Sequence, residues 1–322
     1  MSKRTKPEQN PISKKFKISK KFEEHYRELL GDKYEEFIEY SFSYLRRCVR
    51  INTLKIDFDT AVERLKKKLK LIPIPWCKEG FWVEDKQKER YDFGNMLEHQ
   101  LGYFYLQEAA SMIPAIVLDV EEKMKVLDMC AAPGSKTSQI AQYMNNTGLL
   151  VANDVSASRL KALGGNLQKL GVLNQVITNL SGTHFQKKQE FERVLVDAPC
   201  SGTGTIRKSF KVLDMWAPRL VKKFSYIQKS LIQAGFKALK PGGVMVYSTC
   251  TQEPEENEAV VTWLLENFEN AELMDIDLKI NRSPTFTKWE DKKFHKDIAK
   301  CLKIYPQDND SEGFFVAKIR KN

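Results

Sequence analysis

Several hallmarks of other protein classes are missing from this chain of 322 residues. It has no run of about 18 apolar residues, so no membrane-spanning helix is predicted. Its six cysteines are scattered without a C-x-x-C pair, and its four histidines show no ligand spacing, which argues against a bound metal. The basic N-terminus lacks the apolar core of a signal peptide. We therefore expect a reduced, cytoplasmic protein that holds no metal and does not engage a membrane.

The overall composition is that of a globular protein. Apolar residues make up 42% of the chain and charged residues 29%, with 16 glycines and 12 prolines, which excludes a collagen-like or largely disordered protein. The length exceeds one average domain and leaves ample material for a buried core. We expect one large domain of catalytic size and a smaller one.

Positive charge is concentrated at the N-terminus. The net charge is +10, and residues 1–21 hold eight basic residues against the single acid Glu8, so the rest of the chain is nearly balanced. We expect a basic flexible tail over residues 1–21. Such a tail either gains affinity for phosphates through counterion release or only keeps the protein soluble, and charge alone does not choose between these roles.

The residues after the tail predict a small α/β domain at 22–92. The predicted elements are, in order, two helices within 22–48, a strand at 50–56, a helix at 61–71 and a short strand at 80–84. Pro73 should follow the end of the third helix. The polar run 85–91 is the expected linker, and a second domain should occupy residues 93–322.

From residue 125 onward, apolar strands alternate with helices, which is typical of a parallel, doubly wound sheet. The predicted strands lie at 126–129, 149–153, 175–178, 193–196 and 244–247, and the predicted helices at 135–144, 156–170, 221–239 and 255–267. Two more strands at 301–305 and 314–319 should form an antiparallel hairpin at the edge of this sheet. The predicted fold class is therefore α/β.

A loop of small residues follows the first of these strands. Residues 128–137 are DMCAAPGSKT, and small side chains let a ligand approach the backbone at the carboxyl end of a strand. Asp154 lies 20 residues after Gly134, at the end of the next strand, where a carboxylate can accept hydrogen bonds from ribose hydroxyls. A G-x-G-x-x-G fingerprint and a complete P-loop are both absent, which weakens NAD and ATP as ligands. A tight turn with an unrelated second acid is the alternative.

Two cysteines follow two other strands of this sheet. Asp197 and Cys200 belong to the run DAPCSG, and Cys250 belongs to the run YSTC. If the two strands are neighbours, these three side chains converge at the crevice that Asp154 would line. A single cysteine after a strand is more often a buried small apolar residue than a catalyst. Two cysteines at one rim, one of them three residues after an acid, favour an active site.

Together these three runs resemble the signature motifs of the NOL1/NOP2/Sun family of RNA cytosine-5 methyltransferases, with archaeal tRNA-modifying members the most similar. Residues 50–55 (RINTLK) are similar to the family's R-x-N-T-L-K element, and residues 107–111 (QEAAS) to its Q-[DE]-x-x-S segment. Pro306 followed by residues 313–317 (GFFVA) resembles its closing segment. The resemblance covers about residues 22–319.

The resemblance implies the Rossmann-like fold of S-adenosylmethionine-dependent methyltransferases, with a small RRM-like domain at the N-terminus. It implies S-adenosyl-L-methionine as cofactor and Cys250 as the nucleophile that attacks C6 of cytosine, because C5 alone is a poor nucleophile. Asp197 would assist at the N3 edge, and Cys200 would assist loss of the C5 proton and release of Cys250. Lys136 would be a cation beside the thiol, or only a phosphate contact.

The resemblance also assigns the residues that bind the cofactor. Asp154 would hold the ribose, with Arg159 nearby and Asp197 close to the methyl donor. Many relatives carry an aspartate where this chain has Ser181, so Asn179 or Ser181 would bind the adenine edge instead. The backbone cradle would consist of Cys130, Ala131, Ala132, Pro133, Gly134, Ser135 and Lys136.

RNA is the partner that the resemblance implies. Arg207, Lys208 and Lys211 could grip its backbone, with Phe210 against a base, or they could form an ordinary exposed loop. In the N-terminal domain the candidates are Arg46, Arg47, Arg50, Phe81 and Trp82, of which the two aromatic residues could equally belong to the core.

Transfer RNA is the favoured substrate and ribosomal RNA the alternative, because no additional helical-bundle or PUA-type module is evident. A DNA cytosine-5 methyltransferase would use the Pro-Cys cysteine as nucleophile and would not need Cys250. A non-catalytic RNA-binding assembly factor would need neither cysteine. Both alternatives are therefore less favoured, and we expect a monomer.

Overall fold

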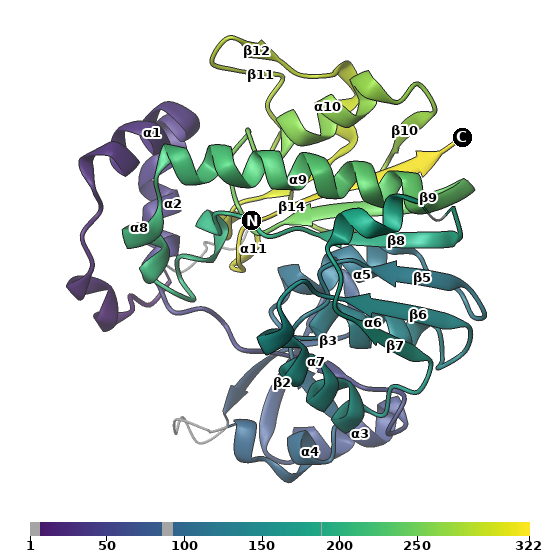
Figure 1. Ribbon diagram of the computed structural model, residues 1–322. Coiled ribbons are helices and arrows are strands. Elements are labelled where there is room, and N and C mark those ends of the chain that lie inside the picture. Colours follow the sequence, from purple (N-terminus) through teal and green to yellow (C-terminus); the bar gives the residue numbers. More distant parts are fainter. Residues whose placement is uncertain (1–6, 86–92, 188) are drawn as a thin grey trace.

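The computed structural model describes residues 7–85, 93–187 and 189–322, which form two main sheets (Figure 1). The smaller sheet has the strand order β2-β3-β1-β4 and lies at the bottom of the view in Figure 1. A two-stranded ribbon, β11 (Lys288–Trp289) with β12 (Lys292–Lys293), projects at the top. Within these ranges, no helix is long and apolar enough to cross a membrane.

The smaller sheet is antiparallel, with one helix packed on it. Its strands are β1 (Cys48–Ile51), β2 (Leu69–Ile74), β3 (Cys77–Asp85) and β4 (Phe104–Leu106), and its helix is α3 (Phe58–Lys66). The Asp57 carboxylate caps α3 by accepting from the Thr60 backbone N–H at 3.0 Å. β4 joins this sheet although it lies beyond the division expected at residue 92. Apart from Asp85, the expected linker lies outside the described residues.

Two predictions for this sheet are wrong. The helix predicted at 61–71 ends at Lys66, and the chain enters β2 at Leu69. Pro73 lies within β2, where it is tolerated because β2 is an edge strand. The strand predicted at 50–56 already ends at Ile51, because the chain turns at Asn52, whose carbonyl accepts from the Lys55 N–H at 3.1 Å.

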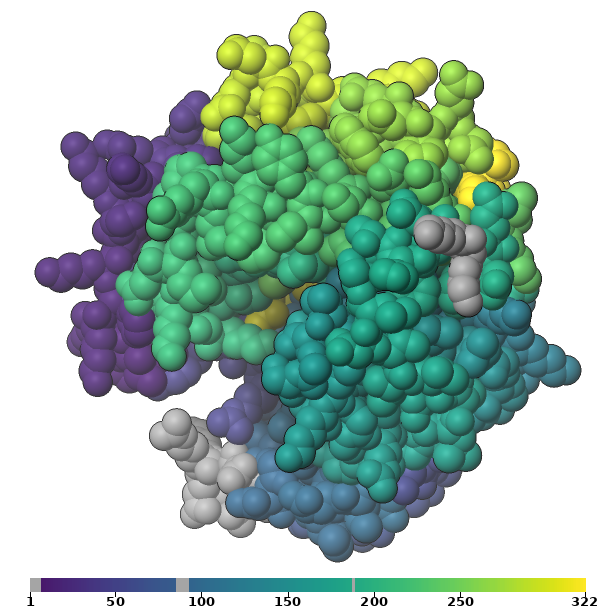
Figure 2. Space-filling view, in the orientation of Figure 1, coloured from purple at the N-terminus to yellow at the C-terminus, as the bar shows by residue number. Residues whose placement is uncertain are grey.

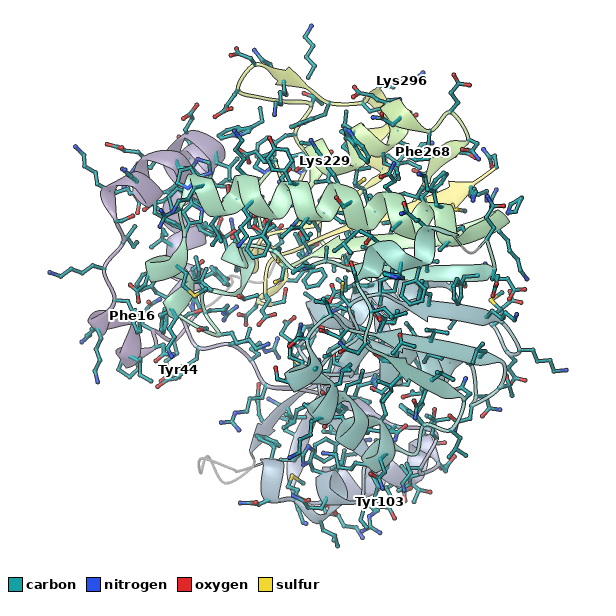
Figure 3. All side chains as sticks on the ribbon, in the orientation of Figure 1. Phe16, Tyr44, Tyr103, Lys229, Phe268 and Lys296 are labelled. Atoms are coloured by element: carbon teal, nitrogen blue, oxygen red, sulfur yellow. The ribbon has the colours of Figure 1, made fainter. Side chains whose placement is uncertain are left out.

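The first two helices pack on the larger part of the chain. α1 (Lys20–Leu30) and α2 (Tyr34–Ser41) confirm the two helices predicted within 22–48. Their apolar faces share a cluster with Phe210 and Trp216, which flank α8 (Lys211–Met215). Upstream, residues 11–15 form a 3-10 helix, and Phe16 packs on Phe210 with ring centroids 5.3 Å apart (Figure 3). The expectation of a flexible tail is therefore wrong for residues 7–21.

The larger sheet confirms all five predicted parallel strands. They are β5 (Lys125–Asp128), β6 (Leu149–Asn153), β7 (Gln175–Thr178), β8 (Phe191–Asp197) and β9 (Leu239–Thr249). The strand order is β10-β14-β9-β8-β5-β6-β7. The chain runs outward from β5 through β6 to β7 and then returns to β8 on the other side of β5. This reversal creates a crevice at the carboxyl ends of β5 and β8, where open α/β sheets bind their ligands.

Helices cover both faces of the larger sheet (Figure 1). One face carries α5 (Ile113–Leu118), α6 (Ser135–Tyr143) and α7 (Ala157–Leu170), and the other carries α9 (Pro218–Ala238) and α10 (Glu258–Asn267). Val126 packs into the first layer and its neighbour Leu127 into the second. Because the strands are buried on both faces, they are continuously apolar in sequence. The four helices predicted from residue 125 onward are confirmed.

The C-terminal hairpin is present at the edge of the sheet as predicted, but only its first strand is an edge strand. β13 (Leu302–Ile304) and β14 (Phe314–Lys321) pair antiparallel, as predicted. β14 also pairs with β9 on one side and with β10 (Ala271–Met274) on the other. Phe315 and Val316 point to opposite faces and both are fully buried, so the apolar sequence of β14 suits an interior strand.

Candidate active site

The chemically notable side chains lie together at the carboxyl ends of four adjacent strands. Asp154 follows β6, Asp197 ends β8, and Cys250 follows β9. β8 and β9 are parallel neighbours in which Asp197 is paired with Ser248, so the two strands reach the same rim. Figure 2 shows this face hollowed between α7 in teal and α9 in green, with yellow C-terminal atoms visible inside.

The two cysteines at this rim are in direct contact. The Sγ atoms of Cys200 and Cys250 lie 3.2 Å apart, and both side chains are half-buried. The hydrogen bond with Cys250 raises the pKa of Cys200 well above its usual value, and burial adds to the effect. Cys200 is therefore held as a thiol next to the second sulfur, and a proton can pass between them.

An ion pair lies beside the sulfurs. Lys136 Nζ lies 2.7 Å from Asp197 Oδ2 and donates a second hydrogen bond to Ser111 Oγ at 3.1 Å. The Ser248 hydroxyl donates to the other Asp197 oxygen at 2.8 Å. Burial acts to lower the pKa of Lys136, but the charge and hydrogen bond of Asp197 outweigh it and raise the pKa. Lys136 is consequently a fixed cation, and the charge of a Cys250 thiolate would stabilise it further.

A cavity of about 500 Å³, which we call the Asp154 pocket, opens on one side of the sulfurs. It is lined by Met129, Cys130, Ala132, Asp154, Val155, Arg159, Ser181, Gly182, Thr183, Asp197, Ala198, Pro199, Cys200, Ile227, Ser230, Leu231 and Cys250. Asp154 is buried and accepts from the backbone N–H groups of Ala132 and Ser156 at 3.2 and 2.9 Å. Arg159 lies 3.2 Å from its carboxylate. The position of this carboxylate is therefore fixed from three sides.

Only part of the predicted cradle faces the Asp154 pocket. Cys130 and Ala132 line it, whereas Ala131, Pro133, Ser135 and Lys136 line a small adjoining cavity of about 30 Å³. Gly134 starts α6 with φ +105°, and a Cβ there would lie 3.0 Å from the Leu163 side chain, so the turn needs glycine.

The two candidates for the adenine edge are placed differently. The Asn179 side chain donates to the Asp154 carbonyl at 2.7 Å and is not among the residues lining the pocket, so it supports the loop instead. Ser181 lines the pocket, and its hydroxyl lies 2.9 Å from the Thr183 hydroxyl. The prediction for Asn179 therefore needs correction, because its amide is already engaged with the backbone of the Asp154 loop.

A second cavity of about 380 Å³, which we call the Glu312 pocket, opens on the other side of the sulfurs. It is lined by Tyr105, Leu106, Gln107, Glu108, Ser111, Ala132, Pro133, Ser135, Lys136, Arg159, Asp197, Ala198, Thr205, Lys208, Cys250, Glu312 and Phe314. The two pockets share Asp197 and Cys250. A group held in one pocket can thus react with a group held in the other at this shared point.

The sequence motifs gave no role to Glu108 and Glu312, although both lie in segments that carried the family resemblance. Glu108 accepts from the Glu312 backbone N–H at 3.0 Å and from the Ala110 N–H at 2.7 Å. Burial, together with the charge of Glu312, raises the pKa of Glu108 to about 7. Lys208 lies 3.5 Å from the Glu312 carboxylate at the mouth of the pocket. Residues 204 positions apart meet here, which no local pattern could indicate.

Several residues expected to grip RNA are buried instead. The Arg207 guanidinium donates to the Ser43 hydroxyl and the Asp310 carboxylate, both at 2.9 Å, and it ties α2 to the C-terminal segment. Arg50 is fully buried and donates to the Ser138 hydroxyl at 2.8 Å. Phe210, Phe81 and Trp82 are also buried, whereas Lys208 and Lys211 remain exposed.

The family follows from comparison with known proteins. A family model described as 16S rRNA methyltransferase RsmB/F matches residues 115–320, and one described as the N-terminal domain of 16S rRNA methyltransferase RsmF matches residues 18–109. This chain belongs to the RsmB/F methyltransferase family. The family expected from the motifs is thereby confirmed.

Individual relatives are similar in sequence to this RsmB/F-family chain over most of its length. It is 46% identical to tRNA (cytosine(49)-C(5))-methyltransferase of Pyrococcus abyssi, over 95% of this chain and 97% of the relative. It is 45% identical to ribosomal RNA small subunit methyltransferase F of Vibrio campbellii, over 89% of this chain but only 59% of that protein.

Solved structures share its fold. A methyltransferase homolog from Pyrococcus horikoshii is 38% identical, with a TM-score of 0.85 over 97% of this chain and all of its own. NSun6 from Pyrococcus horikoshii, solved with SFG, is 25% identical, with a TM-score of 0.82 over 94% of this chain and 98% of its own. The methyltransferase fold predicted from the sequence is therefore confirmed.

Proposed function

We propose that this protein transfers a methyl group from S-adenosylmethionine to C5 of a cytosine in tRNA, through a covalent bond between Cys250 and C6. The observation that carries this proposal is the meeting of two pockets at Asp197 and Cys250, with the Cys200 and Cys250 sulfurs 3.2 Å apart. The family membership and the RNA methyltransferases among its relatives support the reaction class.

The Asp154 pocket fits a nucleoside cofactor that carries positive charge. Its volume of about 500 Å³ lies in the usual range for such ligands. Asp154 offers a buried carboxylate to ribose hydroxyls, and Val155 and Ile227 offer partly exposed apolar surface to a base. Asp154 and Asp197 also suit a cationic sulfonium group. When bound, S-adenosylmethionine supplies an electrophilic methyl group at the shared end of the two pockets.

The target cytosine would occupy the Glu312 pocket, out of its stack, so loops and junctions in RNA are favoured over paired regions. Lys136 stabilises the Cys250 thiolate, which adds to C6 of the ring. Negative charge that develops at N3 takes up a proton that Lys136 passes on through Asp197, since the two side chains lie 2.7 Å apart. Lys136 can give up this proton because the Cys250 thiolate that it stabilised is by then bonded to C6.

The last step restores aromaticity to the base. The C5 proton leaves as the bond between C6 and the Cys250 sulfur breaks, so the electron pair returns to the leaving thiolate. Cys200 lies beside that sulfur and assists both events in one exchange: it gives its proton to the departing Cys250 sulfur as it takes the C5 proton. N3 returns its proton to the Asp197–Lys136 pair.

Loss of the Asp154 carboxylate should weaken cofactor binding. We expect Asp154→Ala to raise the dissociation constant for S-adenosylmethionine by about tenfold to a hundredfold, because hydrogen bonds between ribose hydroxyls and a charged group are lost. Isothermal titration calorimetry measures this change, and Asp214→Ala, on the exposed side of α8, is the matched control. An unchanged dissociation constant in Asp154→Ala would remove Asp154 from the cofactor site.

The substrate is tested by transfer of labelled methyl from S-adenosylmethionine to unmodified total tRNA, ribosomal RNA and duplex DNA in parallel. We expect label in tRNA as 5-methylcytosine at mapped positions. The tRNA methyltransferase of Pyrococcus abyssi, which this chain matches over 97% of that protein's length, supports this choice. Label in ribosomal RNA alone would replace tRNA as the substrate, and label in DNA alone would overturn the reaction class.

A further inference from the structure

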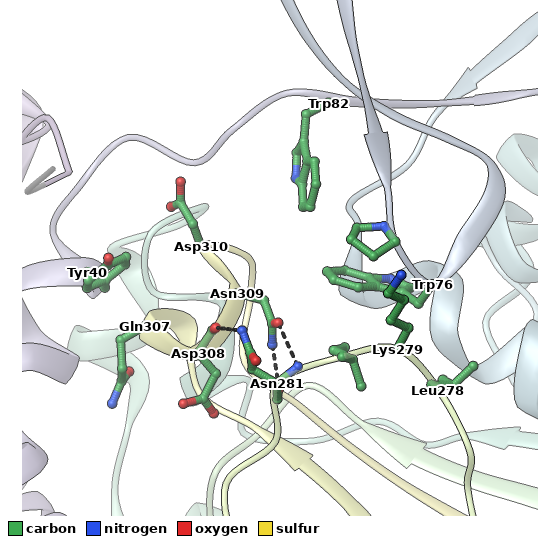
Figure 4. Close-up of a pocket in the computed structure, with 12 residues that line it drawn as sticks. Tyr40, Trp76, Trp82, Leu278, Lys279, Asn281, Gln307, Asp308, Asn309 and Asp310 are labelled. Carbon is green, nitrogen blue, oxygen red and sulfur yellow. Dashed lines mark hydrogen bonds between the residues drawn. The ribbon is translucent and has the colours of Figure 1, made fainter. Parts of the chain in front are cut away.

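A cavity outside the active site has no role in the proposed reaction. It has a volume of about 690 Å³ and lies between the β2–β3 turn, α2 and two C-terminal segments; we call it the Trp82 pocket (Figure 4). It is lined by Tyr40, Pro75, Trp76, Trp82, Leu278, Lys279, Ile280, Asn281, Gln307, Asp308, Asn309 and Asp310. Its walls combine aromatic rings, aliphatic side chains and amides, as a site for a flat polar ligand requires.

Two tryptophans form one wall of the Trp82 pocket. Their rings are in edge contact, with centroids 5.6 Å apart and planes at 87°. The indole N–H of Trp76 is satisfied, because it donates to the Ala109 carbonyl at 2.9 Å. The indole N–H of Trp82 is buried and has no hydrogen-bond partner within the described residues. The residue is 7% exposed and lines the cavity. A buried donor without a partner is costly unless a ligand or water supplies an acceptor.

The opposite wall is polar and rigid. The Asn281 N–H donates to the Asn309 side chain at 3.1 Å, and the Asn309 amide donates back to the Asn281 carbonyl at 2.7 Å. The Asn281 amide donates to the Asp308 carbonyl at 3.1 Å. Figure 4 shows this group of side chains facing the Trp82 ring across the cavity. These bonds hold the side chains in place, and the Asn281 side-chain oxygen, which takes part in none of them, can accept from the edge of a nucleobase.

Two basic side chains, Arg46 and Lys279, flank the Trp82 pocket, whose lining also includes Asp308 and Asp310. The Arg46 guanidinium stacks over the Trp82 ring, 4.3 Å from its centroid, lies 3.9 Å from the Asp310 carboxylate and remains 30% exposed. Lys279 is exposed at the other side of the pocket. Arginine stacked on an aromatic ring is a common platform for unpaired nucleotides, since it offers both a flat face and a charge.

The Trp82 pocket and the Glu312 pocket are lined by neighbouring segments of the chain. Residues 307–310 line the first, and Glu312 and Phe314, in the same short segment, line the second. Trp76 of the first is hydrogen-bonded to Ala109, which directly follows Glu108 of the second. This arrangement is what binding of one RNA strand at both pockets would require.

We propose that the Trp82 pocket binds one unpaired nucleotide of the RNA substrate that lies close to the target cytosine, with its base against the tryptophan wall and a phosphate at Arg46 or Lys279. This inference rests on the proposed function for its substrate class. The site would add affinity for unstacked RNA beyond the target base and would select for a single-stranded neighbour, because a paired base cannot enter it.

The test uses a short single-stranded RNA with one central cytosine, in which each flanking nucleotide in turn is replaced by an abasic ribose. Dissociation constants are measured by fluorescence anisotropy for the unmodified chain, Trp82→Leu, Arg46→Ala and the control Lys223→Ala, an exposed lysine on α9. In the unmodified chain, we expect one abasic position to weaken binding by about tenfold, the loss of one base–aromatic stack. In Trp82→Leu, which has no ring to stack on, the same abasic position should weaken binding by less than about twofold, whereas Lys223→Ala should follow the unmodified chain.

Arg46→Ala keeps the test decisive if Trp82→Leu does not fold. It should weaken binding of the intact RNA and reduce the slope of log affinity against log salt by about one, with an unchanged melting temperature. An equal loss of affinity at every abasic position, or the same position-specific loss in Trp82→Leu, would overturn the subsite. Methyl transfer to the same RNA is followed in parallel. A loss of affinity at one abasic position without any methylation would overturn the proposed reaction and leave the subsite standing.

Discussion

Replacing Cys250 with alanine is expected to abolish methyl transfer, with a loss of about 10⁴-fold or more. Without the thiolate no nucleophile adds to C6, and C5 is not activated to accept the methyl group. The Asp154 pocket keeps its other lining residues, so binding of S-adenosylmethionine should change by less than about threefold. The measurement is single-turnover methyl transfer to tRNA, with calorimetry for the cofactor.

Cys301→Ala is the matched control for this substitution. Cys301 is buried in the apolar layer that contains side chains of α9 and α10, and it lines neither pocket. Its loss should therefore lower stability without affecting methyl transfer. The nucleophile assignment is also tested by trapping with RNA that contains 5-fluorocytosine. A covalent adduct formed by Cys250→Ala but not by Cys200→Ala would exchange the roles of the two cysteines.

The Cys200→Ala substitution should have a different outcome, the accumulation of a covalent protein–RNA complex. Cys250 can still add to C6, but loss of the C5 proton and release of the thiolate are no longer assisted by the neighbouring sulfur at 3.2 Å. We expect steady-state turnover to fall by about a hundredfold, the usual contribution of one proton-transfer group. A complex that resists denaturant should appear on gels as a band of higher mass.

The double variant Cys200→Ala/Cys250→Ala is the control for that band. It lacks the attacking sulfur, so the complex should disappear while unfolding by heat remains close to that of Cys200→Ala. Normal turnover by Cys200→Ala, or a band that persists in the double variant, would contradict the role of Cys200 in elimination.

The strands of the larger sheet and the loops that follow them were predictable because their signals are local. Apolar runs such as Val126–Asp128 and the small residues after them are contiguous in the chain. The contact between Cys200 and Cys250 needed one further assumption, that β8 and β9 are neighbours, which the register Asp197 to Ser248 confirms. The Lys136–Asp197 ion pair joins residues 61 positions apart, and no spacing rule could have paired them.

The positions of basic residues were less predictable. Arg50 and Arg207 have the charge expected of RNA contacts, yet each is buried against partners more than 80 positions away in the chain. Local sequence indicates that a residue is charged, but burial depends on whether a distant hydroxyl or carboxylate lies within hydrogen-bond reach. The same reason accounts for α1 and α2, whose amphipathic pattern was evident but whose docking partner, the Phe210 cluster, was not.

The order of motifs along the chain was therefore sufficient for the fold class and the family, and it indicated Cys250, Cys200 and Asp197 as the residues of the proposed chemistry. Tertiary structure decided the separation of the site into an Asp154 pocket and a Glu312 pocket, the interior position of β14, and the existence of the Trp82 pocket. Secondary structure and loop motifs depend on neighbours within a few residues, whereas cavities and ion pairs depend on which distant segments pack together. Cavities and ion pairs of this kind can therefore be identified only in the folded chain.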